Sequence, residues 1–421
     1  MNKTLVLLCF AFAGLGSLFA QPIPVELRQT PEGWQMFRGG EPYYVRGGGG
    51  TGDLELLVAS GGNSIRTWSA ADARPILDQA HSLGISVMVG LWMGQERQGF
   101  DYSDPYAVED QLRAFRDDVR ELKDHPAVLL WGVGNEVDLF YTDFNVWDAV
   151  EKICAMIHEE DPLHPTCVVT AGIDVAEIQL IRERAPSVDM LGFNTYGDLP
   201  RVPRLVDRYG YTGPYLITEW GTDGHWEVPK TDWGVPVELT GTQKATLYAE
   251  RYRNAIAADS AQCLGSYAFL WSQKQETTPT WYGVFLEDGS PTASIDALAD
   301  SWGMPPTNRA PVIETYTLQN RDPYSSLRLA PGEAVSIQLV AKDPGSGPLR
   351  IRWELLPESQ DIKAGGDRES RPTAVPLSIN GDLESGFSFR APRAKGSFRL
   401  FVYLYEDGGR AVAANYPFLV D

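Results

Sequence analysis

Between residues 43 and 302 the chain alternates short apolar runs with longer amphipathic stretches, and this alternation restricts the fold more than any other feature. A short apolar run bounded by Gly or Pro is typical of a strand buried on both faces. The eight predicted strands are residues 43–46, 64–68, 86–92, 128–134, 167–171, 190–196, 215–218 and 266–271. Eight strand and helix units predict a (β/α)8 barrel, whose active face lies at the carboxyl ends of its strands.

The glycine-rich segment 47–52 raises one alternative, a doubly wound sheet with a phosphate-binding turn after its first strand. No acidic ribose partner follows a second strand, and glycine runs are common wherever a loop needs backbone freedom. We therefore expect the barrel, with the catalytic domain spanning residues 21–304.

After the Pro-rich linker 305–311 the pattern changes to period-2 alternation between turn clusters, which indicates antiparallel strands. The predicted C-terminal domain, residues 312–421, is an immunoglobulin-like β-sandwich. It shows no catalytic cluster, and its aromatic residues mostly alternate as core residues do. We expect it to be a spacer or a packing partner of the barrel.

Residues 1–20 combine Lys3 with an apolar run that is too short to span a membrane, which is typical of a secretory signal peptide. The mature protein is then expected in a periplasm or outside the cell, with no membrane insertion after cleavage. Three cysteines would remain (Cys154, Cys167 and Cys263), an odd number that predicts buried free thiols.

The formal net charge of −20 repels nucleic acid and anionic membranes and favours a neutral substrate. No HExxH, CxxC or carboxylate-rich calcium loop is present, so no metal and no cofactor is predicted. The oligomeric state is open.

Two glutamates, Glu136 and Glu219, each end a predicted barrel strand, the fourth and the seventh. Retaining glycoside hydrolysis needs two carboxylates, one as nucleophile and one as acid and then base. Because parallel barrel strands end at one mouth, residues distant in sequence can meet there. The alternative for either residue is a surface carboxylate in a loop.

The segments 131–136 (WGVGNE) and 217–221 (ITEWG) resemble the acid/base and nucleophile strands of the retaining glycoside hydrolases of clan A. Segments 63–68 and 192–197 are similar to the catalytic domain of glycoside hydrolase family 2, and the likeness spans about residues 37–303. The resemblance implies that Glu136 is the acid/base and Glu219 the nucleophile. It also implies substrate-site roles for Arg66, Asn135 and Tyr196, with Tyr196 and Arg66 holding Glu219 and Asn135 binding the sugar 2-hydroxyl.

The resemblance further implies that Trp271, at the end of the eighth predicted strand, stacks under the sugar that is cleaved; a core position is the alternative. Trp92 and Trp220 also end strands and are expected to bind substrate. Among the tryptophans at strand ends or in the following loops, we expect two or three to line a sugar cleft. His225 is either a substrate contact or structural.

The chain departs from family 2 in two ways: about twenty mature residues precede the first predicted strand, and Ser69–Asp72 replaces the family's His-Tyr-Pro stretch. A single barrel followed by one sandwich looks closer to glycoside hydrolase family 158, which implies internal cleavage of β-1,3-glucan. The leading hypothesis is a retaining endo-β-glucanase. The alternatives are a β-glucan transglycosylase using the same residues and a non-catalytic carbohydrate-binding protein on a barrel scaffold.

Overall fold

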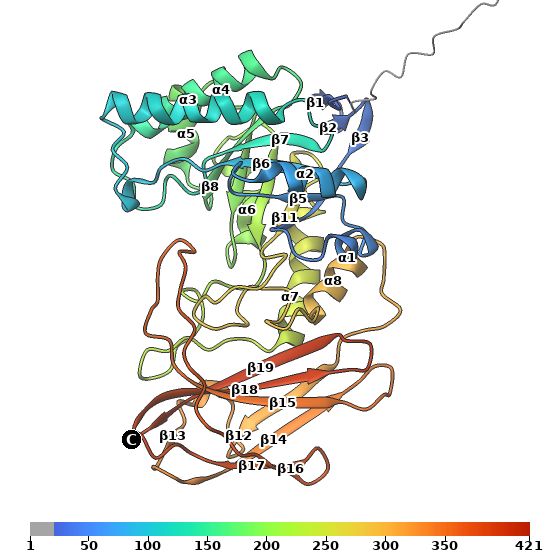
Figure 1. Ribbon diagram of the computed structural model, residues 1–421, viewed down its shortest axis with the longest axis vertical. Coiled ribbons are helices and arrows are strands. Elements are labelled where there is room, and N and C mark those ends of the chain that lie inside the picture. Colours follow the sequence, from blue (N-terminus) through green and yellow to red (C-terminus); the bar gives the residue numbers. More distant parts are fainter. Residues whose placement is uncertain (1–20) are drawn as a thin grey trace, which may run out of the picture.

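The computed structural model describes residues 21–421 as a barrel with a β-sandwich packed beneath it (Figure 1). The predicted signal peptide, residues 1–20, lies outside the described residues. Within residues 21–421, no helix has both the length and the apolar character needed to cross a bilayer.

Eight parallel strands close into a barrel, in agreement with the prediction. Each strand pairs with its neighbours in chain order, and the last pairs with the first. The strands are β4 (Val45–Gly49), β5 (Ser64–Arg66), β6 (Ser86–Leu91), β7 (Val128–Val133), β8 (Thr166–Ala171), β9 (Met190–Asn194), β10 (Tyr215–Trp220) and β11 (Cys263–Ala268).

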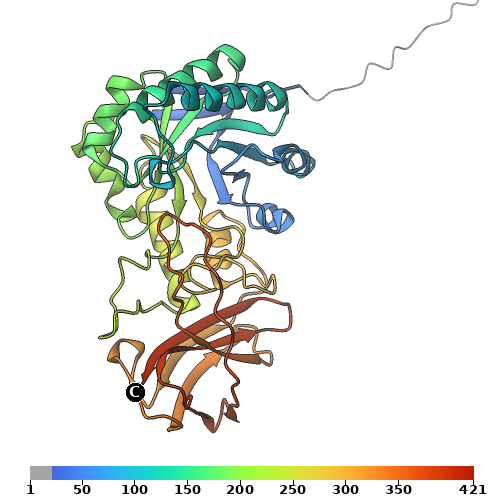
Figure 2. The ribbon, with the colours of Figure 1, turned by 60° about the vertical axis from the view of Figure 1, so that its left-hand side comes forward.

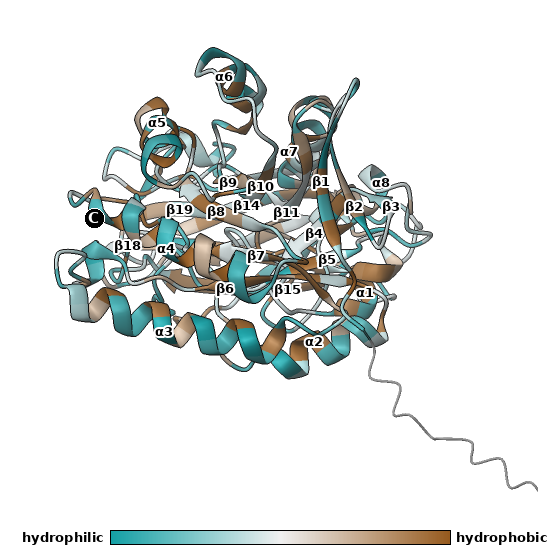
Figure 3. Ribbon diagram, turned by 90° about the horizontal axis from the view of Figure 1, so that it is seen from above, coloured by the Kyte–Doolittle hydropathy of each residue, from teal (hydrophilic) through white to brown (hydrophobic). Residues whose placement is uncertain are grey.

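Helices cover the outside of the barrel, and hydrophilic residues follow the outer side of α2 and α3 (Figure 3). This one-sided pattern buries an apolar stripe of each helix against the strands. The helices are α1 (Leu54–Ala59), α2 (Ala73–Ser82), α3 (Pro105–Leu122), α4 (Asn145–Glu160), α5 (Val175–Arg184), α6 (Val202–Arg208), α7 (Gly241–Arg251) and α8 (Ala293–Ser301). A π-helical turn, Tyr252–Ile256, extends α7, and short 3-10 turns cover Glu96–Gln98, Leu199–Arg201 and Pro323–Ser325.

The first half of the glycine-rich segment, Gly47–Gly49, lies within the first barrel strand, β4, and residues 50–52 follow it. The sequence had predicted a strand at 43–46 with the whole segment in the loop after it. Neighbouring aromatic rings explain why glycine is needed there. A Cβ on Gly47 would lie 2.3 Å from the Tyr267 ring, and one on Gly48 would lie 2.6 Å from Cβ of Trp271. The glycines therefore let the last strand and its bulky side chains approach the first.

An antiparallel sheet that the sequence pattern did not predict precedes the barrel. It consists of β1 (Val25–Thr30), β2 (Gly33–Arg38) and β3 (Glu41–Tyr43). Its backbone bonds to the segments that lead into barrel strands, for example Val25 N–H to the Leu163 carbonyl at 2.9 Å. Val25 and Met36 pack with residues of the barrel interior, so this sheet closes the end opposite the strands' carboxyl ends.

The C-terminal domain is a sandwich of two four-stranded sheets, as predicted. One sheet has the order β12-β14-β17-β16 and the other β13-β19-β18-β15. The strands are β12 (Val312–Leu318), β13 (Arg328–Leu329), β14 (Ala334–Lys342), β15 (Arg350–Pro357), β16 (Asn380–Asp382), β17 (Gly386–Arg390), β18 (Gly396–Tyr405) and β19 (Ala411–Val420).

Strands β18 and β19 are buried on both faces. Along β18, Leu400 and Val402 point into the sandwich core, whereas Phe401, Tyr403 and Tyr405 form a separate cluster with Leu286 of the barrel domain. The outer face of this sheet therefore packs on the barrel domain. The prediction that the aromatic residues of this domain mostly belong to the sandwich core holds for Trp353, Phe387, Phe389 and Phe398. The other three, those of the β18 cluster, pack at the junction with the barrel domain.

The three described cysteines, Cys154, Cys167 and Cys263, are buried and free, as expected from their number.

Candidate active site

A cavity of about 890 Å³ opens at the carboxyl ends of the barrel strands. Both predicted catalytic glutamates line it, together with residues from the loops after β6, β7, β8, β9, β10 and β11. Such a position is the usual place of an active site in a (β/α)8 barrel.

Glu219 lies on β10, and its carboxylate accepts three side-chain hydrogen bonds. Arg66 and Trp68 donate to Oε1 at 3.0 Å and 2.8 Å, and the Tyr196 hydroxyl donates to Oε2 at 3.0 Å. The contacts predicted between Glu219 and both Arg66 and Tyr196 are thus present; Trp68 is a third donor. A group that only accepts hydrogen bonds has the pattern of an ionised carboxylate.

Arg66 is only 2% exposed and hydrogen-bonds to several residues of the site. Besides Glu219, its guanidinium donates to Asn135 Oδ1 at 2.6 Å and to the Thr218 carbonyl at 2.9 Å. Asn194 joins the same network, because its Nδ2 donates to Asn135 Oδ1 at 3.1 Å and to Glu136 Oε1 at 3.0 Å. A single buried arginine therefore connects β5, β7, β9 and β10.

Glu136 follows β7 in a left-handed backbone conformation, with φ of 50°. Few non-glycine residues adopt this conformation, and those that do concentrate at functional sites. Its backbone N–H is held by the Val169 carbonyl at 3.0 Å. The loop geometry directs the side chain into the cavity, which it lines beside Asn194.

The pKa of Glu136 is raised to about 8, first by burial and then by the negative charge of Glu219. The hydrogen bond from Asn194 and the charge of Arg66 oppose this rise only in part. Glu136 therefore carries a proton at neutral pH, while Glu219 lies among three donors. The two carboxylates occupy opposite electrostatic environments.

Two further acids near the site also have raised pKa values. Burial raises the pKa of Asp138, two residues after Glu136, to about 7, and the carboxylate accepts the Ala171 N–H. Burial likewise raises the pKa of Glu276, which lines the cavity and pairs with Lys274 at 2.8 Å. Sequence reasoning did not single out either residue.

Three tryptophans line the cavity: Trp68, Trp92 and Trp226. Trp226 is the most accessible, with 55% of its surface exposed. Phe269 and Leu270, which directly follow β11, complete the apolar part of the lining. A cavity wall of this kind offers flat faces for the apolar side of a sugar ring.

Trp220 and Trp271 do not line the cavity, contrary to prediction, and both are fully buried. Trp220 follows Glu219 in the strand, so the alternation of side chains turns it to the outer face, where it packs on Tyr248 at 5.2 Å between ring centroids. Trp271 lies beyond the end of β11 and donates to the Asp53 carbonyl at 2.9 Å. Its ring stacks on Trp302, so the core alternative holds for Trp271, and the expectation of substrate binding by Trp220 is wrong.

His225 lines the cavity, between the rings of Trp226 and Trp281. Burial lowers the pKa of its imidazole, which favours the neutral form at neutral pH. Sequence reasoning left its role open because a loop position alone gives no partner.

The sandwich domain also contributes to the cavity wall, through the consecutive residues 362–366. This contribution was missed, because nothing in the period-2 pattern of the domain marks a long loop as part of a distant site.

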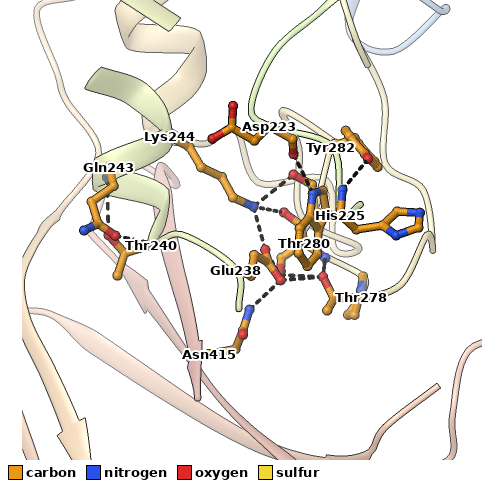
Figure 4. Close-up of polar contacts among 12 residues, drawn as sticks. Asp223, His225, Glu238, Thr240, Gln243, Lys244, Thr278, Thr280, Tyr282 and Asn415 are labelled. Atoms are coloured by element: carbon orange, nitrogen blue, oxygen red, sulfur yellow. Dashed lines mark hydrogen bonds and ion pairs between the residues drawn. The ribbon is translucent and has the colours of Figure 1, made fainter. Parts of the chain in front are cut away.

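A buried polar network joins the two domains below the cavity (Figure 4). Glu238, in the loop after β10, accepts from Lys244 of α7 at 2.5 Å, from Thr278 at 2.6 Å and from Asn415 of β19 at 2.6 Å. Lys244 also donates to the backbone carbonyls of Thr280 and Trp281. This network fixes the sandwich relative to the loops that form the cavity.

Comparison with known proteins places the chain near β-glycosidases. No described protein family matches it at the level of a family profile. A β-glucuronidase of Chlorocebus aethiops is 26% identical over 189 residues, which cover 41% of this chain and 27% of the relative. The β-galactosidase BoGH2A of Bacteroides ovatus is 25% identical over 215 residues, 42% of this chain and 24% of the relative.

Among solved structures, the β-glucuronidase of Bifidobacterium dentium superimposes with a TM-score of 0.54 at 19% identity, over 68% of this chain and 50% of that one. This likeness supports the shared barrel fold. The chain spans about a quarter of the length of the curated relatives it matches. The two curated relatives confirm the predicted resemblance to glycoside hydrolase family 2. Membership of clan A and the likeness to family 158 stay predictions.

Proposed function

We propose that this protein is a retaining β-glycosidase with Glu219 as nucleophile and Glu136 as acid/base. The observation that carries the proposal is the contrast between the two carboxylates. Glu219 accepts from Arg66, Trp68 and Tyr196, whereas Glu136 accepts from one amide and has a pKa raised to about 8. Double displacement needs one ionised and one protonated carboxyl group.

In the first step Glu219 attacks the anomeric carbon, and Glu136 gives its proton to the departing glycosidic oxygen. Attack converts the Glu219 carboxylate into an ester, so the charge that helped to raise the pKa of Glu136 disappears. Glu136 is then better suited to accept a proton from the water that cleaves the ester. Asn135, held by Arg66 and Asn194, is proposed to bind the 2-hydroxyl of the sugar.

The mechanism predicts a basic limb in the pH dependence of kcat/KM near the pKa of Glu136, about 8. Activity should fall about tenfold per pH unit above that value, because the acid form of Glu136 is lost. A rate profile that stays flat up to pH 10 would contradict the assignment.

Neutral sugars suit the cavity better than uronic acids. Lys274 is already paired with Glu276, and its ammonium also donates to the Gly366 carbonyl at 2.6 Å. Besides the protonated Glu136, four acids line the cavity against two lysines; these acids are Asp198, Glu219, Glu227 and Glu276. A substrate carboxylate would meet a net negative surface, so we expect nitrophenyl β-glucosides and β-galactosides to be cleaved faster than the β-glucuronide.

Internal cleavage of β-1,3-glucan is the specific substrate proposal, and it rests on the predicted resemblance to family 158. The relatives named above offer β-galactosides and β-glucuronides as other candidates. Product analysis by mass spectrometry on β-1,3-glucan, mixed-linkage glucan, xylan, mannan and galactan oligosaccharides separates these cases, with Glu219→Gln as the inactive control.

Proton NMR during the first turnovers tests retention, because the first product must carry the β-anomer. Products longer than the substrate would favour the transglycosylase alternative. If the wild type binds a glycan while neither it nor Glu219→Gln cleaves any, the proposal fails and the carbohydrate-binding alternative replaces it.

A further inference from the structure

The longest excursion of the sandwich domain is the segment between β15 and β16, residues 358–379, which we call the sandwich loop. It rises from the sandwich to the mouth of the barrel (Figures 1 and 2). Residues 362–366 near its tip line the same cavity as Glu136 and Glu219. A domain that served only as a spacer or as a packing partner would not need a loop that lines this cavity.

The tip is attached to the barrel by charged side chains from two barrel loops. The guanidinium of Arg97 donates to both carboxylate oxygens of Asp367, at 3.0 Å and 3.2 Å. The side-chain amide of Gln98 donates to the same carboxylate at 3.0 Å. Lys274, after β11, donates to the Gly366 carbonyl at 2.6 Å. The tip is therefore held from the β6 side and the β11 side of the mouth.

Glu369 makes a second attachment and is only 5% exposed. One carboxylate oxygen accepts the Thr277 N–H of the barrel at 2.6 Å, and the other accepts the Lys363 N–H of the sandwich loop at 3.0 Å. The same side chain thus fixes the loop's own shape and its position over the cavity.

The base of the loop is fixed as well. Glu358 pairs with the buried Arg399 at 2.9 Å, and Arg399 donates to the Pro236 carbonyl of the barrel at 2.8 Å. Arg399 also bonds to Asn415, which joins the Glu238 network of Figure 4. Fixed at both tip and base, the loop presents a preformed wall to the cavity.

The contacts of Gly365 place the tip beside the loop that carries Glu136. Gly365 has φ of +64°, and a Cβ there would lie 2.7 Å from the Arg97 guanidinium and 2.9 Å from Leu139. Leu139 and Phe140 lie in the same loop as Glu136 and line the cavity with it. Because the acid must face the departing oxygen, the leaving group of the substrate belongs on this side.

Two exposed apolar side chains occur on this part of the lining. Phe140 is 69% exposed and Ile362 of the sandwich loop is 47% exposed, although both are large hydrophobic residues. Apolar surface left uncovered beside a functional cavity indicates a binding surface. The apolar face of a sugar ring is a suitable occupant.

We propose that the sandwich loop, through Ile362 and its neighbours, forms with Phe140 a subsite for the leaving group of an oligosaccharide. The sandwich domain is then part of the substrate site and sets how well a substrate with a second sugar is used. This inference rests on the proposed glycosidase function and adds to it the recognition of the departing sugar.

The test compares Ile362→Ser with the wild type on two substrates that share the same glycon. One is the β-glycosyl fluoride, whose leaving group is a single atom and cannot reach the subsite. The other is an oligosaccharide of the same sugar. We expect kcat/KM for the oligosaccharide to fall about tenfold through KM, and that for the fluoride to stay within twofold.

Leu383→Ser is the matched control, because Leu383 is an exposed apolar residue of the same domain, in the β16–β17 turn, and does not line the cavity. It should leave both substrates unchanged. Equal losses on both substrates in Ile362→Ser, or no loss on either, would overturn the subsite. If the wild type hydrolyses no glycosyl fluoride and no glycan of the panel named above, the proposed function itself fails.

Discussion

Two glutamates, the half-buried Glu136 at the cavity and the buried Glu238 at the junction of the domains, have opposite electrostatic surroundings. Glu238 accepts from Lys244, Thr278, Thr280 and Asn415. Burial alone would raise its pKa, but Lys244, Arg399 and these hydrogen bonds lower it overall. Glu136 has a single donor, and its pKa is raised to about 8.

Removal of a carboxylate from solvent therefore does not by itself indicate a catalytic role. The junction glutamate is fully satisfied and ionised, so it has no tendency to exchange a proton and serves packing. The cavity glutamate has too few donors to hold a charge, so it keeps a proton that can be given to a substrate. The following predictions, from the largest effect to the smallest, test this difference.

Glu219→Gln should lower kcat by about a thousandfold or more, because the nucleophile of the proposed mechanism is removed. The measurement is steady-state hydrolysis of the best nitrophenyl glycoside. Glu314→Gln removes a carboxylate from an exposed ion pair on β12 and is the control. Activity in Glu219→Gln within tenfold of the wild type would rule out the assigned nucleophile.

Glu238→Gln should destabilise the folded protein by about 3–5 kcal/mol, since it leaves Lys244 buried without its counter-charge. Urea unfolding followed by tryptophan fluorescence measures the loss. The double variant Glu238→Gln with Lys244→Met should recover part of it. A single variant as stable as the wild type would show that the junction does not depend on this ion pair.

Glu136→Gln should instead stabilise the protein, and only at higher pH. The folded-state pKa of Glu136, about 8, lies above the ordinary value of 4.5, so the wild type loses stability as pH rises between these values. The variant lacks this loss, and its advantage should grow from near zero at pH 4 to on the order of 4 kcal/mol at pH 8.

Thermal or urea unfolding at both pH values measures this advantage, with Glu121→Gln on the exposed end of α3 as the control. An advantage that is the same at pH 4 and pH 8 would mean that Glu136 is not held protonated in the folded state.

Tyr196→Phe should lower kcat by roughly tenfold, because one of the three donors to Glu219 is lost while Arg66 and Trp68 remain. Tyr106→Phe, at a residue that is 82% exposed, is the control for the same chemical change. An unaltered kcat in Tyr196→Phe would indicate that the hydroxyl does not contribute to the charge balance at Glu219.

Glu136 and Glu219 could be predicted because they end predicted barrel strands, and the resemblance to family 2 implied Asn135, Arg66 and Tyr196. Glu136, Asn135, Arg66, Tyr196 and Glu219 were identified from sequence, and the structure brings all of them into one hydrogen-bonded network. Trp220 and Trp271 were misplaced, because a strand-end aromatic can face either the cavity or the surrounding helices. For Trp220 the alternation of side chains along β10 decides the face, and for Trp271 the space beside Gly48 does.

The barrel, the sandwich and the pair of glutamates were predictable from the sequence, because they depend on local periodicity and on residues at the ends of strands. The packing of the folded domains, in contrast, brings residues 362–366 into one cavity with Glu136 and Glu219. Tertiary contacts also make Asn194 the one donor to Glu136 and give Glu238 four donors. Long-range contacts of this kind produce no periodic pattern in the sequence. They depend on where the folded elements pack and not on neighbouring residues in the chain.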